Sequence, residues 1–107
     1  HSRFEDGKKS SPDELLGAAL ASCFSMALAN EVDQKGGTPE SIETDAEVTL
    51  AKTGDGFSIT EIQLTTKGKV SGMEHGDFIE LANKAKDNCP VGKALKAVNI
   101  NLDAELL

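Results

Sequence analysis

Small and hydrophobic residues fill nearly every position between residues 15 and 29. A helix with this pattern is expected to be covered by protein on all sides. The preceding segment Ser11–Glu14 predicts its start, because serine can cap the helix, proline suits the first turn and the glutamate completes a capping box. The pair Gly36-Gly37 predicts its end.

Two alternating segments follow and predict a β-hairpin. Apolar and polar residues alternate from 42 to 50, which is typical of a half-exposed strand. The segment 57–70 predicts a second strand, and its apolar phase slips near Thr60-Glu61, so we expect a β-bulge there. The turn at 53–56, which contains two glycines, joins the two strands.

The C-terminal third predicts a helix, a helical turn and a last strand. Asp77 opens a second capping-box pattern, and the helix is expected to end near Asn88, because Pro90 disfavours a helical residue before it. A short helical turn is expected over 91–96, and alternation over 98–106 predicts a strand. The helix residues expected to point inward are Phe78, Ile79, Leu81, Ala82 and Ala85.

The order of elements indicates one α+β domain over residues 1–107. Three strands and one short helix can scarcely cover the long apolar helix. The chain also begins with His1 rather than Met. We therefore expect further strands upstream and a second subunit to cover that helix.

The composition excludes several classes of partner. Lys and Arg number 11 against 18 Asp and Glu, which gives a formal net charge of −7. This acidic balance argues against binding to nucleic acid or to an anionic membrane. We see no uninterrupted apolar run of about 18 residues and no basic, apolar leader, so neither a bilayer span nor secretion is expected.

The two cysteines, Cys23 and Cys89, are the main candidates for chemistry. There is no CxxC pair and there are only two histidines, so a structural zinc site is not expected. A cysteine pair in such a chain points to the reducing cytoplasm and to redox activity. Each cysteine also has a structural interpretation, Cys23 as a small core residue and Cys89 as a buried residue at a helix stop.

A reactive Cys23 needs a nearby cation to stabilise its thiolate. The dipole of its own helix fades within the first turn, so the cation must come from elsewhere. Arg3, the only arginine, offers a planar donor fork, although the pattern alone favours a solvated loop charge for it. Cys89, accessible at a helix end, could attack an oxidised Cys23. Asp13 and Glu14 both suit an ordinary first helical turn.

Three motifs are similar to those of one known family. The segment SSPDELLGAALASCFSMALA resembles the signature helix of the OsmC/Ohr family of organic hydroperoxide reductases. NCPVGKALKA resembles its second-cysteine motif, and SRFEDG resembles the loop that carries its arginine. The phrases ASCFSMAL and CPVGKAL favour the OsmC branch. The resemblance spans essentially the whole chain and implies an OsmC-like intertwined homodimer, with antiparallel sheets around a long central helix and N-terminal strands that this chain lacks.

The resemblance also implies a mechanism. Cys23 would attack the peroxide and become a sulfenic acid, and Cys89 would close a disulfide with it. An external dithiol, for which the family suggests a lipoyl group, would reduce that disulfide. Arg3 would activate Cys23, held by the family's carboxylate, a glutamate whose position Asp13 occupies here, with Glu14 as the alternative. No metal, haem or flavin is required, and the implied role is defence against oxidative and osmotic stress.

An apolar pocket would favour organic peroxides over hydrogen peroxide, and Phe4, Phe24 and Met26 are candidates to line it. Asp13 and Cys23 are separated by about 15 Å along one straight helix, so we expect both subunits to contribute to each active site. Two other functions stay open. One is a dimeric binding protein on the same fold without peroxidase activity, and the other is a general disulfide oxidoreductase, which the lack of CxxC disfavours.

Overall fold

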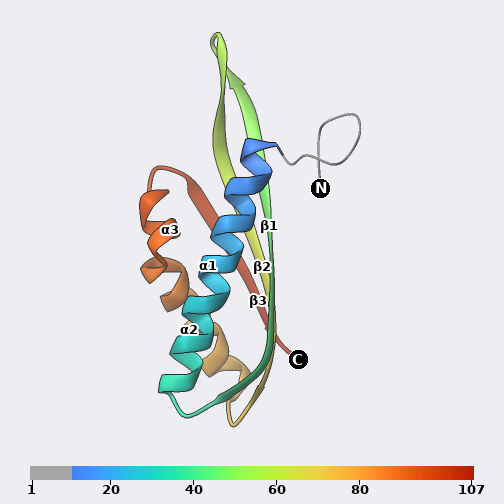
Figure 1. Ribbon diagram of the computed structural model, residues 1–107, viewed down its shortest axis with the longest axis vertical. Coiled ribbons are helices and arrows are strands. Elements are labelled where there is room, and N and C mark those ends of the chain that lie inside the picture. Colours follow the sequence, from blue (N-terminus) through green and yellow to red (C-terminus); the bar gives the residue numbers. More distant parts are fainter. Residues whose placement is uncertain (1–10) are drawn as a thin grey trace.

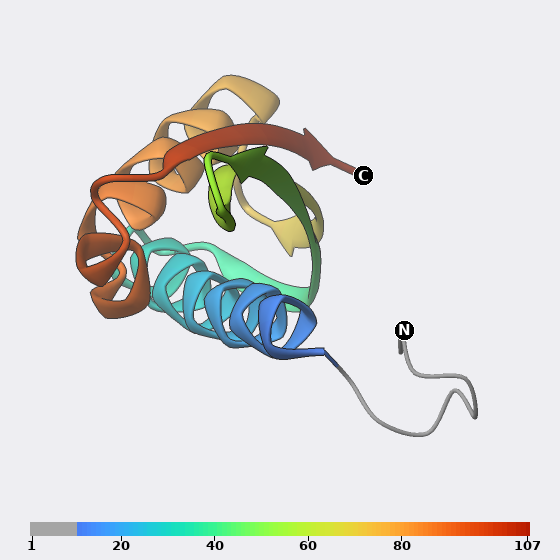
Figure 2. The same ribbon diagram turned by 90° about the horizontal axis from the view of Figure 1, so that it is seen from above.

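The computed structural model describes residues 11–107, so Arg3 and Phe4 lie outside the described residues. Within these residues, three helices and three strands follow one another in the α+β arrangement that the pattern predicts (Figure 1). The helices lie on one side of the sheet (Figure 2), where the two longer helices pack on the strands and the short helix packs on those two helices. The elements are α1 (Pro12–Gln34), β1 (Thr38–Thr53), β2 (Gly56–Ser71), α2 (His75–Asn88), α3 (Pro90–Ala94) and β3 (Asn99–Leu106).

The β1–β2 hairpin confirms the predicted bulge. Thr49 pairs with Glu61, but the next residue, Leu50, pairs with Ile59, so Thr60 is the extra residue on β2. This insertion is the phase slip seen in the apolar pattern. At the tip, Gly54 has φ +60°, a conformation that suits glycine because it has no Cβ.

The third strand pairs in a direction that the resemblance did not imply. β3 runs parallel to β2, from Glu61 opposite Asn99 to Gly68 opposite Leu106, and the sheet order is β1-β2-β3. The described sheet is therefore mixed rather than antiparallel. A parallel pair needs a long crossover, and α2 and α3 provide it.

The hydrophobic core lies between α1, α2 and the β2 face. The Phe78 ring of α2 packs directly on Gly68 of β2. A residue with a Cβ does not fit at this position, because that Cβ would stand 2.5 Å from the ring. The largest side chains of this core are fully buried: Leu20, Phe24, Leu28, Val32, Ile62, Leu64 and Phe78.

A line of hydroxyl groups joins α1 to the sheet through this core. Ser25 Oγ donates to Thr44 Oγ1 at 2.6 Å, and Thr44 Oγ1 lies 2.9 Å from Thr66 Oγ1. Thr66 is fully buried and donates in turn to the backbone carbonyl of Glu43 at 3.2 Å. Each hydroxyl finds an acceptor, so the burial of these polar groups costs little.

Two sequence predictions about the helices need correction. α2 begins at His75 with Glu74 as its N-cap, two residues before the predicted start at Asp77. α1 is not covered on all sides in the described chain, because Leu15 is 58% and Met26 is 72% exposed. Sheet and helices cover one side of α1 and leave the other open.

By length and composition alone, α1 is apolar enough to cross a bilayer, contrary to the expectation from the sequence. The core helix of a globular domain passes the same test. The buried side of α1 packs against β1, α2 and α3, and a third of its apolar window is buried within the described chain. Packing in the described chain therefore accounts for the buried side of α1 and leaves apolar residues of its other side, such as Leu15 and Met26, uncovered.

Candidate active site

Cys89 lies at the junction of α2 and α3, where the sequence predicts a helix break. Pro90 prevents a helical conformation at Cys89, whose ψ of 128° is extended. The Cys89 N–H still closes α2 on the carbonyl of Ala85 at 2.9 Å, and its carbonyl accepts from the Lys93 N–H that opens α3, also at 2.9 Å. The side chain is held at this corner with no exposed surface.

Cys23 lies about three turns into α1, on the side that faces α3. Its side chain is half-buried and packs against the core cluster that includes Cys89. Its outer side opens into a hollow of about 490 Å³. We name this the Cys23 hollow, and its lining is mostly apolar: Ala19, Ser22, Cys23, Met26, Ala27, Asn30 and Pro90.

The two thiols are neighbours. The pKa of the Cys89 thiol is raised, first by burial and then by the side chain of Cys23, and negative charge on Cys23 raises it further. The backbone N–H groups of Gly92 and Val91 oppose this rise without cancelling it. Burial beside a second thiol therefore favours the protonated form of Cys89.

The structure decides between the interpretations of the two cysteines that the pattern left open. The apolar surroundings of Cys23 favoured a core residue, and Cys23 is half-buried with its outer side on the Cys23 hollow. Cys89 could be accessible or buried at a helix stop, and it is buried, with 0% of its surface exposed. The packing of α3 against α1 covers Cys89, and spacing along one helix does not reveal such a contact.

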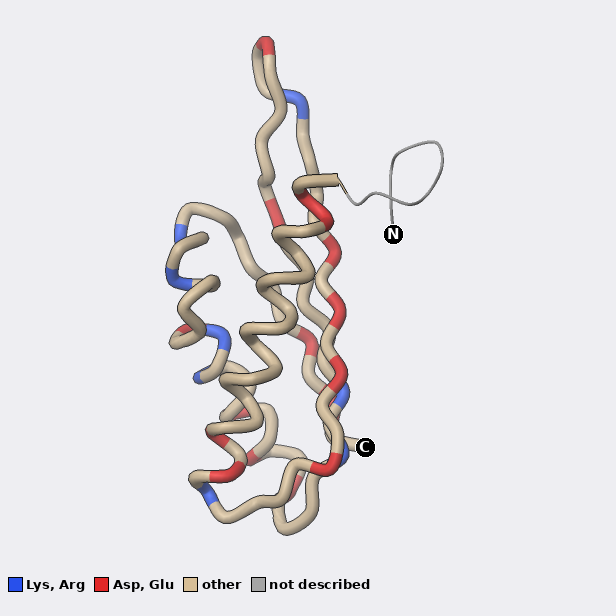
Figure 3. Tube along the Cα trace, in the orientation of Figure 1, with Lys and Arg blue, Asp and Glu red and all other residues tan. Residues whose placement is uncertain are grey.

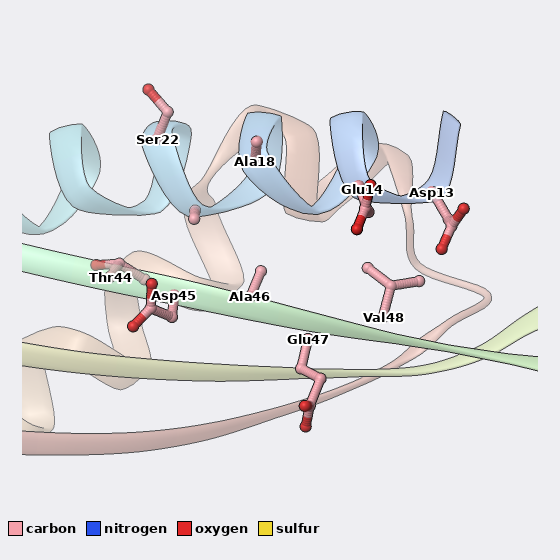
Figure 4. A pocket seen from close by; sticks show the side chains of 10 residues that line it. Asp13, Glu14, Ala18, Ser22, Thr44, Asp45, Ala46, Glu47 and Val48 are labelled. Carbon is pink, nitrogen blue, oxygen red and sulfur yellow. The ribbon is translucent and has the colours of Figure 1, made fainter. Parts of the chain in front are cut away.

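A second hollow lies between α1 and β1, on another side of α1 (Figure 4). We name it the acidic groove, and its volume is about 640 Å³. Asp13 and Glu14 line it from the first turn of α1 and Asp45 and Glu47 from β1, although the Glu47 side chain points away from the helix. Only Ser22 lines both hollows among the described residues.

Asp13 and Glu14 occupy the helix start that the capping pattern predicts. Glu14 Oε1 accepts a hydrogen bond from the backbone N–H of Ser11 at 3.1 Å, as expected for one half of a capping box. Asp13 is buried, with 7% of its surface exposed. The described chain does not bring either carboxylate into the Cys23 hollow, and the predicted partner Arg3 lies outside the described residues.

The predicted pocket residues separate in the structure. Met26 lines the Cys23 hollow, whereas Phe24 is fully buried in the core and does not line it. Phe4 lies outside the described residues. Asn30 and Pro90 were not predicted, although Asn30 follows Cys23 by seven residues, a spacing that places both on one helix side.

The described residues contain no group of three His, Cys, Asp or Glu side chains that could hold a metal ion. At the Cys23 hollow, the described chain presents two neighbouring thiols. One thiol is reachable from an apolar hollow and the other is held behind it, which is an arrangement that can pass from dithiol to disulfide within one domain.

Comparison with known proteins agrees with the sequence motifs. The sequence pattern of the family described as "OsmC-like protein" matches residues 5–103. The protein named Peroxiredoxin OsmC from Escherichia coli (strain K12) is 46% identical over 106 residues, which cover 99% of this chain and 73% of that protein.

Solved structures of the same fold extend the comparison. The organic hydroperoxide resistance protein OhrB of Bacillus subtilis is 26% identical with a TM-score of 0.75, over 95% of this chain and 73% of that one. An OsmC-like protein of unknown function from Vibrio cholerae has a TM-score of 0.79 at 21% identity. There the match covers 90% of this chain but 64% of that chain. On the family match and the E. coli relative, this chain belongs to the OsmC family.

Proposed function

We propose that this protein is a thiol-dependent peroxidase that reduces organic hydroperoxides to alcohols. Its relatives bear the names Peroxiredoxin OsmC and organic hydroperoxide resistance protein OhrB. The observation that carries the proposal is the position of a half-buried Cys23, open to an apolar hollow, beside a fully buried Cys89.

The first step takes place at Cys23. Its thiolate attacks one oxygen of the hydroperoxide, the O–O bond breaks, and the alkoxide takes a proton and leaves as the alcohol. Cys23 is oxidised by two electrons to a sulfenic acid. The apolar lining of the Cys23 hollow, including Met26 and Ala27, favours the alkyl part of an organic peroxide over hydrogen peroxide.

The second step uses Cys89. Its sulfur attacks the Cys23 sulfenic acid, a disulfide forms, and water leaves with the proton of Cys89. Cys23 packs against the core cluster that contains Cys89, so the two sulfurs start this step as neighbours. The raised pKa of Cys89 keeps it a neutral thiol until Cys23 has been oxidised, so it does not compete for the peroxide. An external dithiol then reduces the disulfide.

We further propose that Arg3 activates Cys23 and that Asp13, or its neighbour Glu14, positions Arg3. Within one helix, Asp13 and Cys23 are about 15 Å apart along the axis, which is too far for one side chain to bridge alone. Asp13 also lines the acidic groove rather than the Cys23 hollow. A second copy of α1 removes this difficulty.

The exposed side of α1 carries a stripe that fits a second copy of itself. Leu15, Ala19, Ser22 and Met26 are all exposed and recur at intervals of four, three and four residues, as in a helix–helix seam. Two copies that cross antiparallel between Ala19 and Ser22 place each Leu15 against Met26 of the other copy. This pairing reduces the axial distance from Asp13 to the other copy's Cys23 to about 7.5 Å. We therefore propose a homodimer with shared active sites, working in the cytoplasm.

The rate of the first step tests the function. Reduced wild-type protein and the Cys23→Ser and Cys89→Ser variants are mixed with cumene hydroperoxide, and thiol loss is followed by stopped flow. We expect rapid oxidation in wild type and in Cys89→Ser, and none above the rate of free cysteine in Cys23→Ser. If wild type reacts no faster than free cysteine, the protein is not a peroxidase, and a ligand-binding role on the same fold replaces the proposal.

A further inference from the structure

Lysines gather around the segment that carries Cys89. Residues 84–96 contain four lysines and one aspartate, in a chain whose formal net charge is −7. Figure 3 shows this cluster along α2 and α3, opposite the acidic residues that follow β1. Within the cluster, Lys84 is paired with Glu31 of α1, with 3.4 Å between Nζ and Oε1. On β2, Lys67 lies in register between Glu43 on β1 and Glu105 on β3.

Three of these lysines rim a hollow of about 420 Å³ on the outer side of α3, which we name the lysine hollow. Lys86 is already engaged, since its Nζ donates to the carbonyl of Ile100 at 3.3 Å. Lys93 and Lys96 are exposed, and the carboxylate that lines the hollow with them is Asp87. The hollow therefore presents a net positive surface.

The lysine hollow lies beside the thiols. Gly92 lines it, and a Cβ on Gly92 would stand 3.9 Å from Cys89 Sγ. Pro90, at the other end of the same short helix, lines the Cys23 hollow. α3 has five residues and is about 7.5 Å long, so the two hollows are neighbours on opposite sides of one helical turn.

We propose that Lys93 and Lys96 dock an acidic protein segment that carries the reducing dithiol. This inference rests on the proposed function, in which such a dithiol restores the enzyme. An acidic partner is repelled by most of a surface with this net charge, so a local positive patch directs it to one face. The same patch places the partner next to the mouth of the Cys23 hollow.

The reduction is a two-step exchange. A thiolate of the partner attacks Cys23 Sγ, the sulfur that is reachable from the hollow, and the Cys23–Cys89 bond breaks. Cys89 leaves as a thiolate and takes up a proton. The partner's second thiol then attacks its own sulfur in the mixed disulfide and releases Cys23. The partner is oxidised by two electrons to a disulfide, and both cysteines of this protein are reduced.

Two synthetic dithiol peptides test the docking surface. One has its two cysteines flanked by glutamates, and its twin has glutamines in their place. The Cys23–Cys89 disulfide is formed with diamide, so the measurement does not depend on peroxide chemistry. Second-order rates of reduction are compared in wild type, in the Lys93→Gln/Lys96→Gln variant, and in the control Lys67→Gln/Lys69→Gln, whose exposed lysines lie on β2.

We expect the glutamate peptide to reduce wild type about tenfold faster than its twin at low ionic strength, and high salt to remove this advantage. The Lys93/Lys96 variant is expected to lose the advantage and the control to keep it, while uncharged dithiothreitol reduces all three equally. A wild type without the preference, or a control that loses it as fully, overturns the proposal. Hydroperoxide oxidation of Cys23 is measured in parallel, so that failure of the peroxidase function is seen separately.

Discussion

The fully buried thiol of Cys89 lies beside the half-buried thiol of Cys23, at the contact between α1 and α3, where burial and the Cys23 side chain raise the pKa of Cys89. This relationship assigns different roles to two otherwise similar residues. The thiol that solvent and substrate can reach is Cys23. The thiol behind it is held neutral and protected until its neighbour is oxidised.

Alkylation of the reduced protein should distinguish the two thiols. Iodoacetamide at pH 8 is expected to modify Cys23 rapidly and Cys89 only when the protein is unfolded, because Cys89 is buried and its pKa is raised. Mass spectrometry of tryptic peptides gives the site and the time course, and guanidinium-treated protein serves as the fully reactive control. Equal labelling of both thiols in the native protein would refute the assigned geometry.

Stability should fall in alkaline solution because of Cys89. Its pKa is raised in the folded state above the ordinary value of 9.0, so the unfolded chain releases this proton at lower pH than the folded protein. The free energy of unfolding therefore decreases as the pH rises above about 9. Urea denaturation with a phosphine reductant should show a steeper decrease in wild type than in Cys89→Ala. Parallel curves for the two proteins would argue against a raised pKa.

Gly92 is expected to tolerate no side chain. A Cβ there would stand 3.0 Å from the Lys86 carbonyl oxygen and 3.7 Å from Cys89 Cβ, so Gly92→Ala must displace α3. We expect a loss of about 1–3 kcal/mol in stability and slower closure of the disulfide. The matched control is Gly76→Ala in α2, where nothing lies within 4 Å of the added Cβ.

That control should gain about 0.5–1 kcal/mol, because alanine favours a helix over glycine. Denaturation curves and the rate of disulfide closure after one equivalent of hydroperoxide test both variants. If Gly92→Ala is as stable as Gly76→Ala and closes its disulfide at the wild-type rate, the close packing at this corner is not needed.

The exposed side of α1 should govern assembly. Leu15→Glu places a charge in the proposed seam and is expected to shift the protein from dimer to monomer and to lower peroxidase activity. Sedimentation velocity measures the first effect and cumene hydroperoxide turnover the second. Leu107→Glu is the control, since Leu107 is similarly exposed, at 67%, but lies at the end of the chain. A monomeric wild type that stays fully active on dilution would exclude shared active sites.

The sequence pattern predicted the elements well where local rules apply. The start of α1 at Pro12 follows from capping, and the extra residue Thr60 follows from the slip in apolar phase. The helix break at Cys89 follows from the steric effect of the next proline. These features depend on residues only a few positions away along the chain, so they can be predicted from one sequence.

Features that depend on distant contacts were not predictable in the same way. The parallel pairing of β3 with β2 depends on the path of the α2–α3 crossover. The burial of Cys89 and the opening beside Cys23 depend on how α3 packs against α1. Phe24 and Met26 are two residues apart on an apolar helix, and only the packing decides that one enters the core and the other lines a hollow.

In the proposed mechanism, Cys23 receives the oxygen of the peroxide and Cys89 then closes the disulfide. One equivalent of cumene hydroperoxide is added to the reduced protein, and the products are identified by intact mass and peptide mapping. We predict a Cys23–Cys89 disulfide in wild type and a dimedone-trapped sulfenic acid on Cys23 in Cys89→Ser. Sulfenic acid on Cys89, or oxidation that proceeds unchanged in Cys23→Ser, would contradict the account.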